Sequence, residues 1–180
     1  MAKLTFSQPY QNWTVGLLGR FERDDMALQD ADNIKFVFPN DYDDPEEIQG
    51  WSVTYKAASC SDFAYSQGEG GFMEAVSGKV GSVEVRDDLG NLVMKITEIK
   101  GVDIGDIYHN IVDISDGNGP NADMTKVMEF LMRGNDTLTG TSGDDSFGIH
   151  TDVGNDKYNG KGGNDYFEVG AGDDTVDGGN

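Results

Sequence analysis

Several features are scarce in this 180-residue sequence, and each scarcity excludes a class of protein. Cys60 is the only cysteine, so no intramolecular disulfide can form. The 13 Lys and Arg residues stand against 33 Asp and Glu residues, which gives a net charge of −20 and a pI near 4.1. Because phosphate contacts need clustered cations, we expect neither nucleic acid nor anionic lipid as a direct partner.

Long apolar runs and familiar catalytic motifs are also missing. No window approaches the roughly 20 apolar residues of a membrane span, and the start, MAKLTFSQPY, lacks the apolar region of a Sec signal peptide. There is no H-E-x-x-H motif and no G-x-S-x-G elbow, and the glycine-rich QGEGGF (67–72) lacks the Lys and Ser/Thr of a phosphate-binding loop. A carboxylate-pair hydrolase stays open, but no particular pair stands out. We therefore predict that the protein is not an enzyme.

Glycine and aspartate, by contrast, form an ordered repeat from residue 134 onward. Five Gly-x-Asp-x-apolar units read GNDTL, GDDSF, GNDKY, GNDYF and GDDTV, at spacings of 9, 11, 9 and 9 residues. A flexible Asp/Gly-rich tail would not keep one apolar residue in phase with one aspartate through five units. The pattern therefore predicts short strands joined by tight glycine turns, with one apolar side chain per strand in a core. These side chains are Leu138, Phe147, Tyr158, Phe167 and Val176.

This repeat resembles the nonapeptide repeat of RTX (haemolysin-type) proteins, which builds a calcium-bound parallel β-roll. The resemblance implies that calcium is the cofactor, held by carboxylate and carbonyl oxygens, which are the donors that calcium prefers. It also implies that each ion lies between the turns of units two apart. The pairs are then Asp136 with Asp156, Asp145 with Asp165, and Asp156 with Asp174. The expected metal-site residues are Asp136, Asp145, Asp156, Asp165, Asp174, Gly143, Gly154, Gly160, Gly162, Gly163 and Gly172.

Folding of the repeat segment, residues 134–180, is expected to depend on the ion. The segment holds nine aspartates but only two basic residues, so its carboxylates repel one another. Five apolar side chains cannot offset the conformational entropy of 47 ordered residues. We therefore expect the segment to be disordered without calcium and to fold when calcium neutralises the aspartates. Bridging by calcium would also permit contacts with anionic lipid or nucleic acid.

Three departures from a regular repeat affect these expectations. The glycine positions before the first unit fall on Leu131 and Met132, which continue a helical pattern, so Asp136 should complete only half a site. Two extra residues within IHTDV (149–153) should bulge one turn and empty a site there. The chain stops at Gly178-Gly179-Asn180, the opening of a sixth unit, and shows no recognisable C-terminal signal for type I secretion. This ending suggests a shortened chain.

Residues 1–132 read as an α+β domain that precedes the repeats, 133–180, without a linker. Apolar and polar residues alternate in NIKFVFPN (33–40) and WSVTYKA (51–57), which predicts two half-buried strands. SVEVR and LVMKITEI flank the turn DDLGN and predict a β-hairpin. The stretch 78–108, which contains this hairpin, resembles the segment that precedes the repeats in bacterial secreted calcium-binding proteins.

Two helices are predicted after the hairpin. Asp103 is a good N-cap for the first, within 102–112, whose apolar face carries Ile104, Ile107, Tyr108 and Ile111. The second, within 121–132, has an apolar stripe of Met124, Val127, Met128 and Leu131. Because it leads directly into the first repeat, we expect this last helix to cover the open end of the β-roll.

The remaining candidate sites have simpler interpretations. The acidic PNDYDDPEE (39–47) lacks the ligand spacing of an EF-hand, and Asp44 followed by Pro45 favours a helix start. The acidic DISDGNGPNAD (113–123) is typical of a loop between helices. A haem carrier would need a histidine or tyrosine in loops on both sides of a cleft. The two histidines are His109 and His150, and His109 lies in a predicted helix, where nothing in the sequence pairs it with a particular tyrosine.

These observations favour a secreted, calcium-dependent structural or adhesive module at a bacterial surface, able to assemble with copies of itself. Two alternatives stay open at this point. The chain could be the N-terminal piece of a larger RTX exoprotein whose toxin or hydrolase activity lies downstream, or it could carry haem or another small ligand. The resemblance further implies export by type I secretion and an extracellular location.

Overall fold

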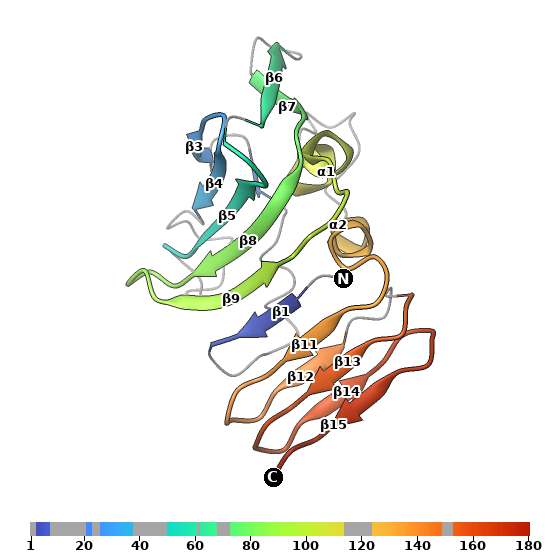
Figure 1. Cartoon of the computed structure of the whole chain (residues 1–180). Coiled ribbons are helices and arrows are strands. Elements are labelled where there is room, and N and C mark those ends of the chain that lie inside the picture. Colours follow the sequence, from blue (N-terminus) through green and yellow to red (C-terminus); the bar gives the residue numbers. More distant parts are fainter. Residues whose placement is uncertain are drawn as a thin grey trace.

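The structure is a computed structural model of the chain, and it describes residues 3–7, 21–22, 26–37, 50–60, 62–67, 73–113, 124–148 and 153–180. These residues form mostly strands, together with two helices. Figure 1 shows the antiparallel strands around β4, β5 and β8 at one end of the molecule. The parallel strands of the repeat segment lie at the other end, where the C-terminus is found beside β15 (Figure 1).

Nine of the described strands form one sheet, in the order β15-β13-β11-β1-β9-β8-β5-β4-β3. The strands from β3 to β1 pair antiparallel, whereas β1, β11, β13 and β15 pair parallel. The sheet therefore crosses from the N-terminal part into the repeat segment without interruption. Its strands are Lys3–Phe6 (β1), Met26–Gln29 (β3), Asn33–Val37 (β4), Ser52–Ala57 (β5), Val80–Arg86 (β8), Leu92–Thr97 (β9), Thr137–Thr139 (β11), Lys157–Asn159 (β13) and Thr175–Asp177 (β15).

The register of this sheet places apolar residues from eight strands in one row. The row runs through Ile34, Tyr55, Val83, Ile96, Leu4, Leu138, Tyr158 and Val176. All of these except Val176 are at most 2% exposed. Because they belong to one cluster of buried side chains, the N-terminal part and the repeat segment share a single apolar core.

The other strands of the described residues form three two-stranded sheets. Parallel strands β12 and β14 belong to the repeat segment, β6 and β7 form an antiparallel hairpin, and β2 pairs with β10 in parallel. Their bounds are Phe21–Glu22 (β2), Ala64–Gln67 (β6), Met73–Ser77 (β7), Val112–Asp113 (β10), Ser146–Gly148 (β12) and Tyr166–Glu168 (β14).

The two strands and the hairpin predicted in the N-terminal part are confirmed. Strand β4 buries Ile34 and Phe36, and β5 buries Val53 and Tyr55, as the alternating pattern requires. The predicted hairpin is β8–β9. Strand β1 was not predicted, and it pairs in parallel with the edge of β11; that the last helix covers the open end of the β-roll stays a prediction. A strand satisfies the backbone groups of that edge, which a helix cannot do.

Both predicted helices are present, as Ile104–Ile111 (α1) and Met124–Leu131 (α2). Asp103 caps α1 as expected, because its Oδ1 accepts hydrogen bonds from the backbone N–H of Gly105 and of Gly78, each at 3.1 Å. Helix α1 lies against β7 and α2. Among the helical side chains that the structure describes, the buried apolar ones are Ile104, Ile107 and Tyr108 of α1, and Val127 and Leu131 of α2.

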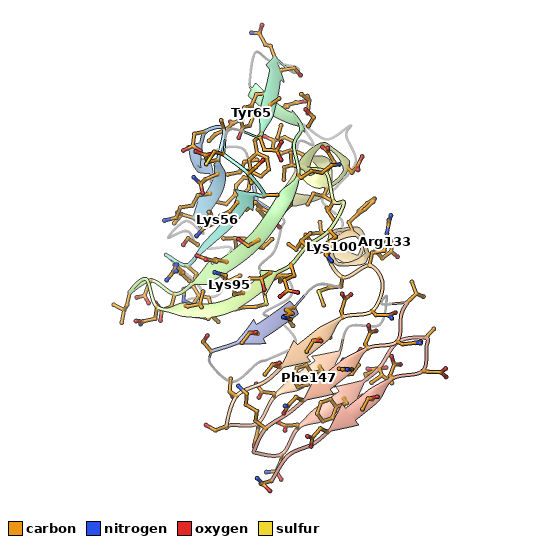
Figure 2. All side chains as sticks on the ribbon, viewed as in Figure 1. Lys56, Tyr65, Lys95, Lys100, Arg133 and Phe147 are labelled. Carbon is orange, nitrogen blue, oxygen red and sulfur yellow. The ribbon has the colours of Figure 1, made fainter. Side chains whose placement is uncertain are left out.

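On the face of the sheet opposite the apolar row, one acidic residue is buried among cations. Glu84 is 5% exposed, and its carboxylate lies 2.8 Å from Lys95, 2.9 Å from Lys56 and 3.1 Å from Arg86. Lys56 and Lys95 are labelled in Figure 2. Burial alone would raise the pKa of Glu84, but hydrogen bonds from these three cations lower it to about 2. The N-terminal part thus supplies the countercharge for its own buried carboxylate.

Candidate metal centre

Successive repeat units alternate between two parallel sheets. Strands β11, β13 and β15 extend the nine-stranded sheet, and β12 and β14 form the second sheet. Paired strands are 20 residues apart for β11–β13 and β12–β14, and 18 residues apart for β13–β15. The two extra residues within IHTDV (149–153) make the interval 20 residues in the first two pairs, compared with 18 in the third. Residues 149–152, where the predicted bulge falls, lie outside the described residues, yet the pairs on both sides of them show no shift in register.

The apolar side chains of the units lie between these two sheets. Leu138, Phe147 and Tyr158 are buried. Phe147, labelled in Figure 2, stacks on Phe167 with ring centroids 5.0 Å apart, and Tyr158 meets each of these rings edge-on at 6.2 Å. Val176 is the exception to the prediction, because it is 47% exposed. It lies on β15, at the end of the nine-stranded sheet, where no further described strand covers it.

The aspartates of units two apart lie together, as the resemblance to RTX repeats implies. The backbone N–H of Asp136 donates to Asp156 Oδ1 at 2.6 Å. The N–H of Asp145 donates to Asp165 Oδ1 at 3.0 Å, and the N–H of Asp156 donates to Asp174 Oδ1 at 2.9 Å. Each bond joins units two apart in the sequence, so the turns stack directly on one another. One oxygen of each later carboxylate therefore fixes the preceding turn.

A second set of hydrogen bonds, which the sequence did not lead us to expect, joins the same turns. The N–H of Asn155 donates to Asn135 Oδ1 at 3.0 Å, the N–H of Asp173 donates to Asn155 Oδ1 at 2.9 Å, and the N–H of Asn164 donates to Asp144 Oδ1 at 2.7 Å. All of these residues occupy the position just before the unit aspartate. The signal was present in the sequence, since that position holds Asn or Asp in all five units.

The second carboxylate oxygen, Oδ2, of two unit aspartates is placed where a cation would stabilise it. Asp156 Oδ2 and Asp165 Oδ2 are buried and have no hydrogen-bond partner. Neither residue forms an ion pair within the described part of the chain. A buried carboxylate without countercharge is strongly destabilising. A bound cation would both satisfy these oxygens and neutralise their charge.

Asp145 has a different environment from these two aspartates. Its Oδ2 accepts a hydrogen bond from the N–H of Thr141 at 2.7 Å and a second from the Thr141 hydroxyl at 3.1 Å. Thr141 belongs to the same turn, and its hydroxyl also accepts from the N–H of Gly143 at 3.1 Å. Groups of the same turn therefore satisfy Oδ2 of Asp145.

The glycines are needed chiefly because other atoms approach their backbone closely. A Cβ on Gly160 would lie 2.1 Å from Asp165 Oδ2, and one on Gly154 would lie 1.9 Å from the Gly134 carbonyl oxygen. Gly172 would clash with the Gly154 carbonyl oxygen at 1.6 Å. The predicted positive φ is present at Gly163, where it is 111°. A Cβ on Gly162, by contrast, would have only one ordinary contact, at 3.4 Å from Asn180 O.

These atoms fit calcium better than a transition metal. Within the described ranges, no three His, Cys, Asp or Glu side chains converge on a common point, so side chains alone do not form a metal site. Each stacked pair brings together carboxylate oxygens and glycine carbonyls of two turns. A donor set made only of oxygen, with carbonyls contributing, is the kind that holds Ca²⁺.

Several other predicted sites cannot be placed. The acidic stretch 39–47, residues 114–123 of the acidic loop 113–123, and His150 lie outside the described residues, and so do residues 68–72 of QGEGGF. His109 lies in α1, as predicted, but its side chain is also outside the described part. None of the helices that the structure describes is long and apolar enough to cross a membrane.

Comparison with known proteins identifies the repeat. The family described as RTX calcium-binding nonapeptide repeat (4 copies) matches residues 132–147 and 150–180. This range contains all five Gly-x-Asp units and both sets of turn-to-turn hydrogen bonds. No curated protein and no solved structure matches the chain. Residues 132–180 therefore consist of RTX calcium-binding nonapeptide repeats, and calcium is the ion that they bind.

Proposed function

We propose that this chain is a secreted, non-enzymatic calcium-binding module with a structural or adhesive role at a bacterial surface. Calcium binds in the turns through Asp136, Asp145, Asp156, Asp165 and Asp174 together with carbonyl oxygens of the turn glycines, and it holds the repeat segment as a β-roll. The observation that carries this proposal is the burial of Asp156 Oδ2 and Asp165 Oδ2 without a partner. The repeat segment needs countercharge, and its two basic residues against ten acidic residues cannot supply it.

The repeat segment then folds outside the cell and not inside it, because the calcium concentration differs. Free calcium inside a cell lies below the range of about 10⁻⁷–10⁻³ M in which sensor and extracellular sites load. The repeat segment stays unfolded there, which suits passage through a type I exporter. Outside the cell, calcium neutralises the aspartates, and the free energy of binding becomes free energy of folding.

Folding also creates a surface for assembly at the β15 end. Strand β15 is an edge of the nine-stranded sheet, and exposed apolar side chains lie on this strand and near it. These are Tyr166 at 56%, Val176 at 47% and Val169 at 40% exposure. An uncovered strand edge flanked by apolar side chains favours pairing with another strand, from a second copy or from the rest of a longer chain. Each bound calcium also removes two negative charges from the surface, which lowers repulsion between copies.

Sedimentation velocity across a calcium titration, with circular dichroism on the same samples, tests the proposal. We expect β-structure and larger species to appear together, and magnesium to produce neither. Val176→Asp should fold with calcium but remain monomeric, because it adds charge to the exposed edge. Leu89→Asp is the matched control, since Leu89 is 81% exposed in the β8–β9 turn, outside the repeat segment. A wild-type chain that folds with calcium and stays monomeric would contradict the assembly role.

A further inference from the structure

The two sets of turn-to-turn hydrogen bonds run in opposite directions. In the Asp set, the later unit supplies the side-chain oxygen and the earlier unit donates the N–H, as from Asp136 to Asp156. In the other set, the earlier unit supplies the oxygen and the later unit donates, as from Asn155 to Asn135. Every stacked pair of turns therefore carries a reciprocal pair of bonds, which we name a clasp.

The clasps divide the five turns into two rows. One row stacks the turns that begin at Gly134, Gly154 and Gly172, and it contains two clasps. The other row stacks the turns that begin at Gly143 and Gly163, and it contains one clasp. In the longer row, the dipeptide Asn155–Asp156 takes part in both clasps, because each residue accepts through its side chain and donates through its backbone N–H. This dipeptide therefore connects the turn that begins at Gly134 with the turn that begins at Gly172.

We propose that Asn135, Asp144 and Asn155 are positioning residues of the calcium sites. Their side-chain oxygens bond to the backbone of the next turn, which sets the distance and register at which the carbonyls and carboxylates of two turns meet. They act through the turn backbone and need no contact with the ion. In the longer row, Asn155 also transmits order from one site to the next, so calcium binds cooperatively along that row. This inference rests on the proposed assignment of the unit aspartates as ligands.

The chain supplies its own matched control. Asn164 occupies the same repeat position as Asn155, and its N–H donates in the same way. Among the described residues, however, the Asn164 side-chain oxygen accepts no bond from another turn, and its Nδ2 makes one long hydrogen bond, to Asp144 Oδ1 at 3.5 Å. Replacing Asn155 breaks a clasp, whereas replacing Asn164 removes the same amide without breaking one.

The test is a calcium titration of full-length Asn155→Ala, Asn155→Asp and Asn164→Ala, followed by circular dichroism and by stopped-flow release of calcium into chelator. Loss of an outer partner of a metal ligand typically weakens binding about 10- to 100-fold. We expect Asn155→Ala to raise the calcium midpoint by about tenfold, to make the titration less steep and to speed release. Asn155→Asp keeps the oxygen acceptor and should restore slow release, and Asn164→Ala should stay within about twofold of the wild type.

The alternative outcomes are distinct. Equal effects of Asn155→Ala and Asn164→Ala, or failure of Asn155→Asp to restore slow release, would overturn the positioning role. If Asn155→Ala does not fold at any calcium concentration, Asn135→Ala is measured instead. The turn of Asn135 leads into β11, and pairing of β11 with β1 should keep this variant folded. Asn135→Ala should then weaken binding, and unchanged binding would overturn the proposal. A separate Asp156→Ala variant with unaltered calcium binding would instead refute the ligand assignment.

Discussion

Two buried carboxylates in this molecule are stabilised in different ways. In the N-terminal part, Glu84 is surrounded by Lys56, Lys95 and Arg86, all from the same sheet. In the repeat segment, Asp156 is 1% exposed and has no ion-pair partner within the described residues. The first carboxylate is neutralised by the chain itself. We propose that the second depends on an ion from the surroundings.

We infer from this difference that the two parts, although they share one sheet, differ in whether they need calcium to fold. The N-terminal part has an apolar core and internal countercharge, so it should fold without calcium. The repeat segment has few apolar side chains for its length and many aspartates, so its order should follow the calcium concentration. The boundary between the two behaviours should lie near β11, which pairs with β1 on one side and with β13 on the other.

The largest expected effect comes from replacing matching tyrosines on the two sides of that boundary. Tyr55 and Tyr158 belong to the same apolar row and are at most 2% exposed. With calcium present, Tyr55→Ala and Tyr158→Ala should each lower the free energy of unfolding by about 3–5 kcal/mol, because a large buried ring is lost. In chelator, Tyr55→Ala should keep its effect and Tyr158→Ala should lose most of it. Urea unfolding followed by circular dichroism measures both.

A calcium-independent effect of Tyr158→Ala would mean that the repeat segment is folded without the ion. The comparison between the two parts would then fail, whatever the affinity of the calcium sites.

The next effect concerns two aspartates within the repeat segment. Asp165 lies in a turn that contains Gly160, Gly162 and Gly163, whereas Asp136 follows helix α2 directly. Asp165→Ala should therefore weaken calcium binding at least tenfold, or about 1.4 kcal/mol, and more than Asp136→Ala. Calorimetric titration of the two variants measures the difference. Equal losses would show that the first unit already forms a complete site.

The smallest effect is expected at Glu84. Its folded-state pKa is depressed from 4.5 to about 2, so its contribution to stability is present above pH 4.5 and is lost as the pH falls toward 2. Glu84→Gln should cost about 1 kcal/mol at pH 7 and remove that part of the acid dependence. Urea unfolding in chelator at pH 7 and pH 3 isolates the N-terminal part. Glu129→Gln, an exposed change on α2, is the control and should leave the acid dependence as it is.

Much of the local structure could be predicted from the sequence. Alternation predicted β4 and β5, the Asp103 cap predicted the start of α1, and the resemblance to RTX repeats implied the pairing of Asp136 with Asp156. Each of these features depends on residues close in sequence or on a fixed period.

The features that sequence reasoning missed depend on contacts between distant segments. Strand β1 is short, and its partners β9 and β11 lie about 90 and 130 residues away, so no local pattern identifies it. The exposure of Val176 depends on which strand stacks upon β15, and the repeat pattern says nothing about that neighbour. The hydrogen bonds of Asn135 and Asn155 were not predicted because their partners are backbone N–H groups in turns 20 and 18 residues away.

Hydrogen exchange of the full chain, measured by mass spectrometry with calcium, with magnesium and with chelator, tests the central claim most directly. Strands β8 and β9 should be protected under all three conditions. Strands β13, β14 and β15 should be protected with calcium only, because magnesium requires a small octahedral shell that stacked turns of carbonyls and carboxylates do not provide. Protection of β13 to β15 in chelator, or equal protection with magnesium, would contradict the account.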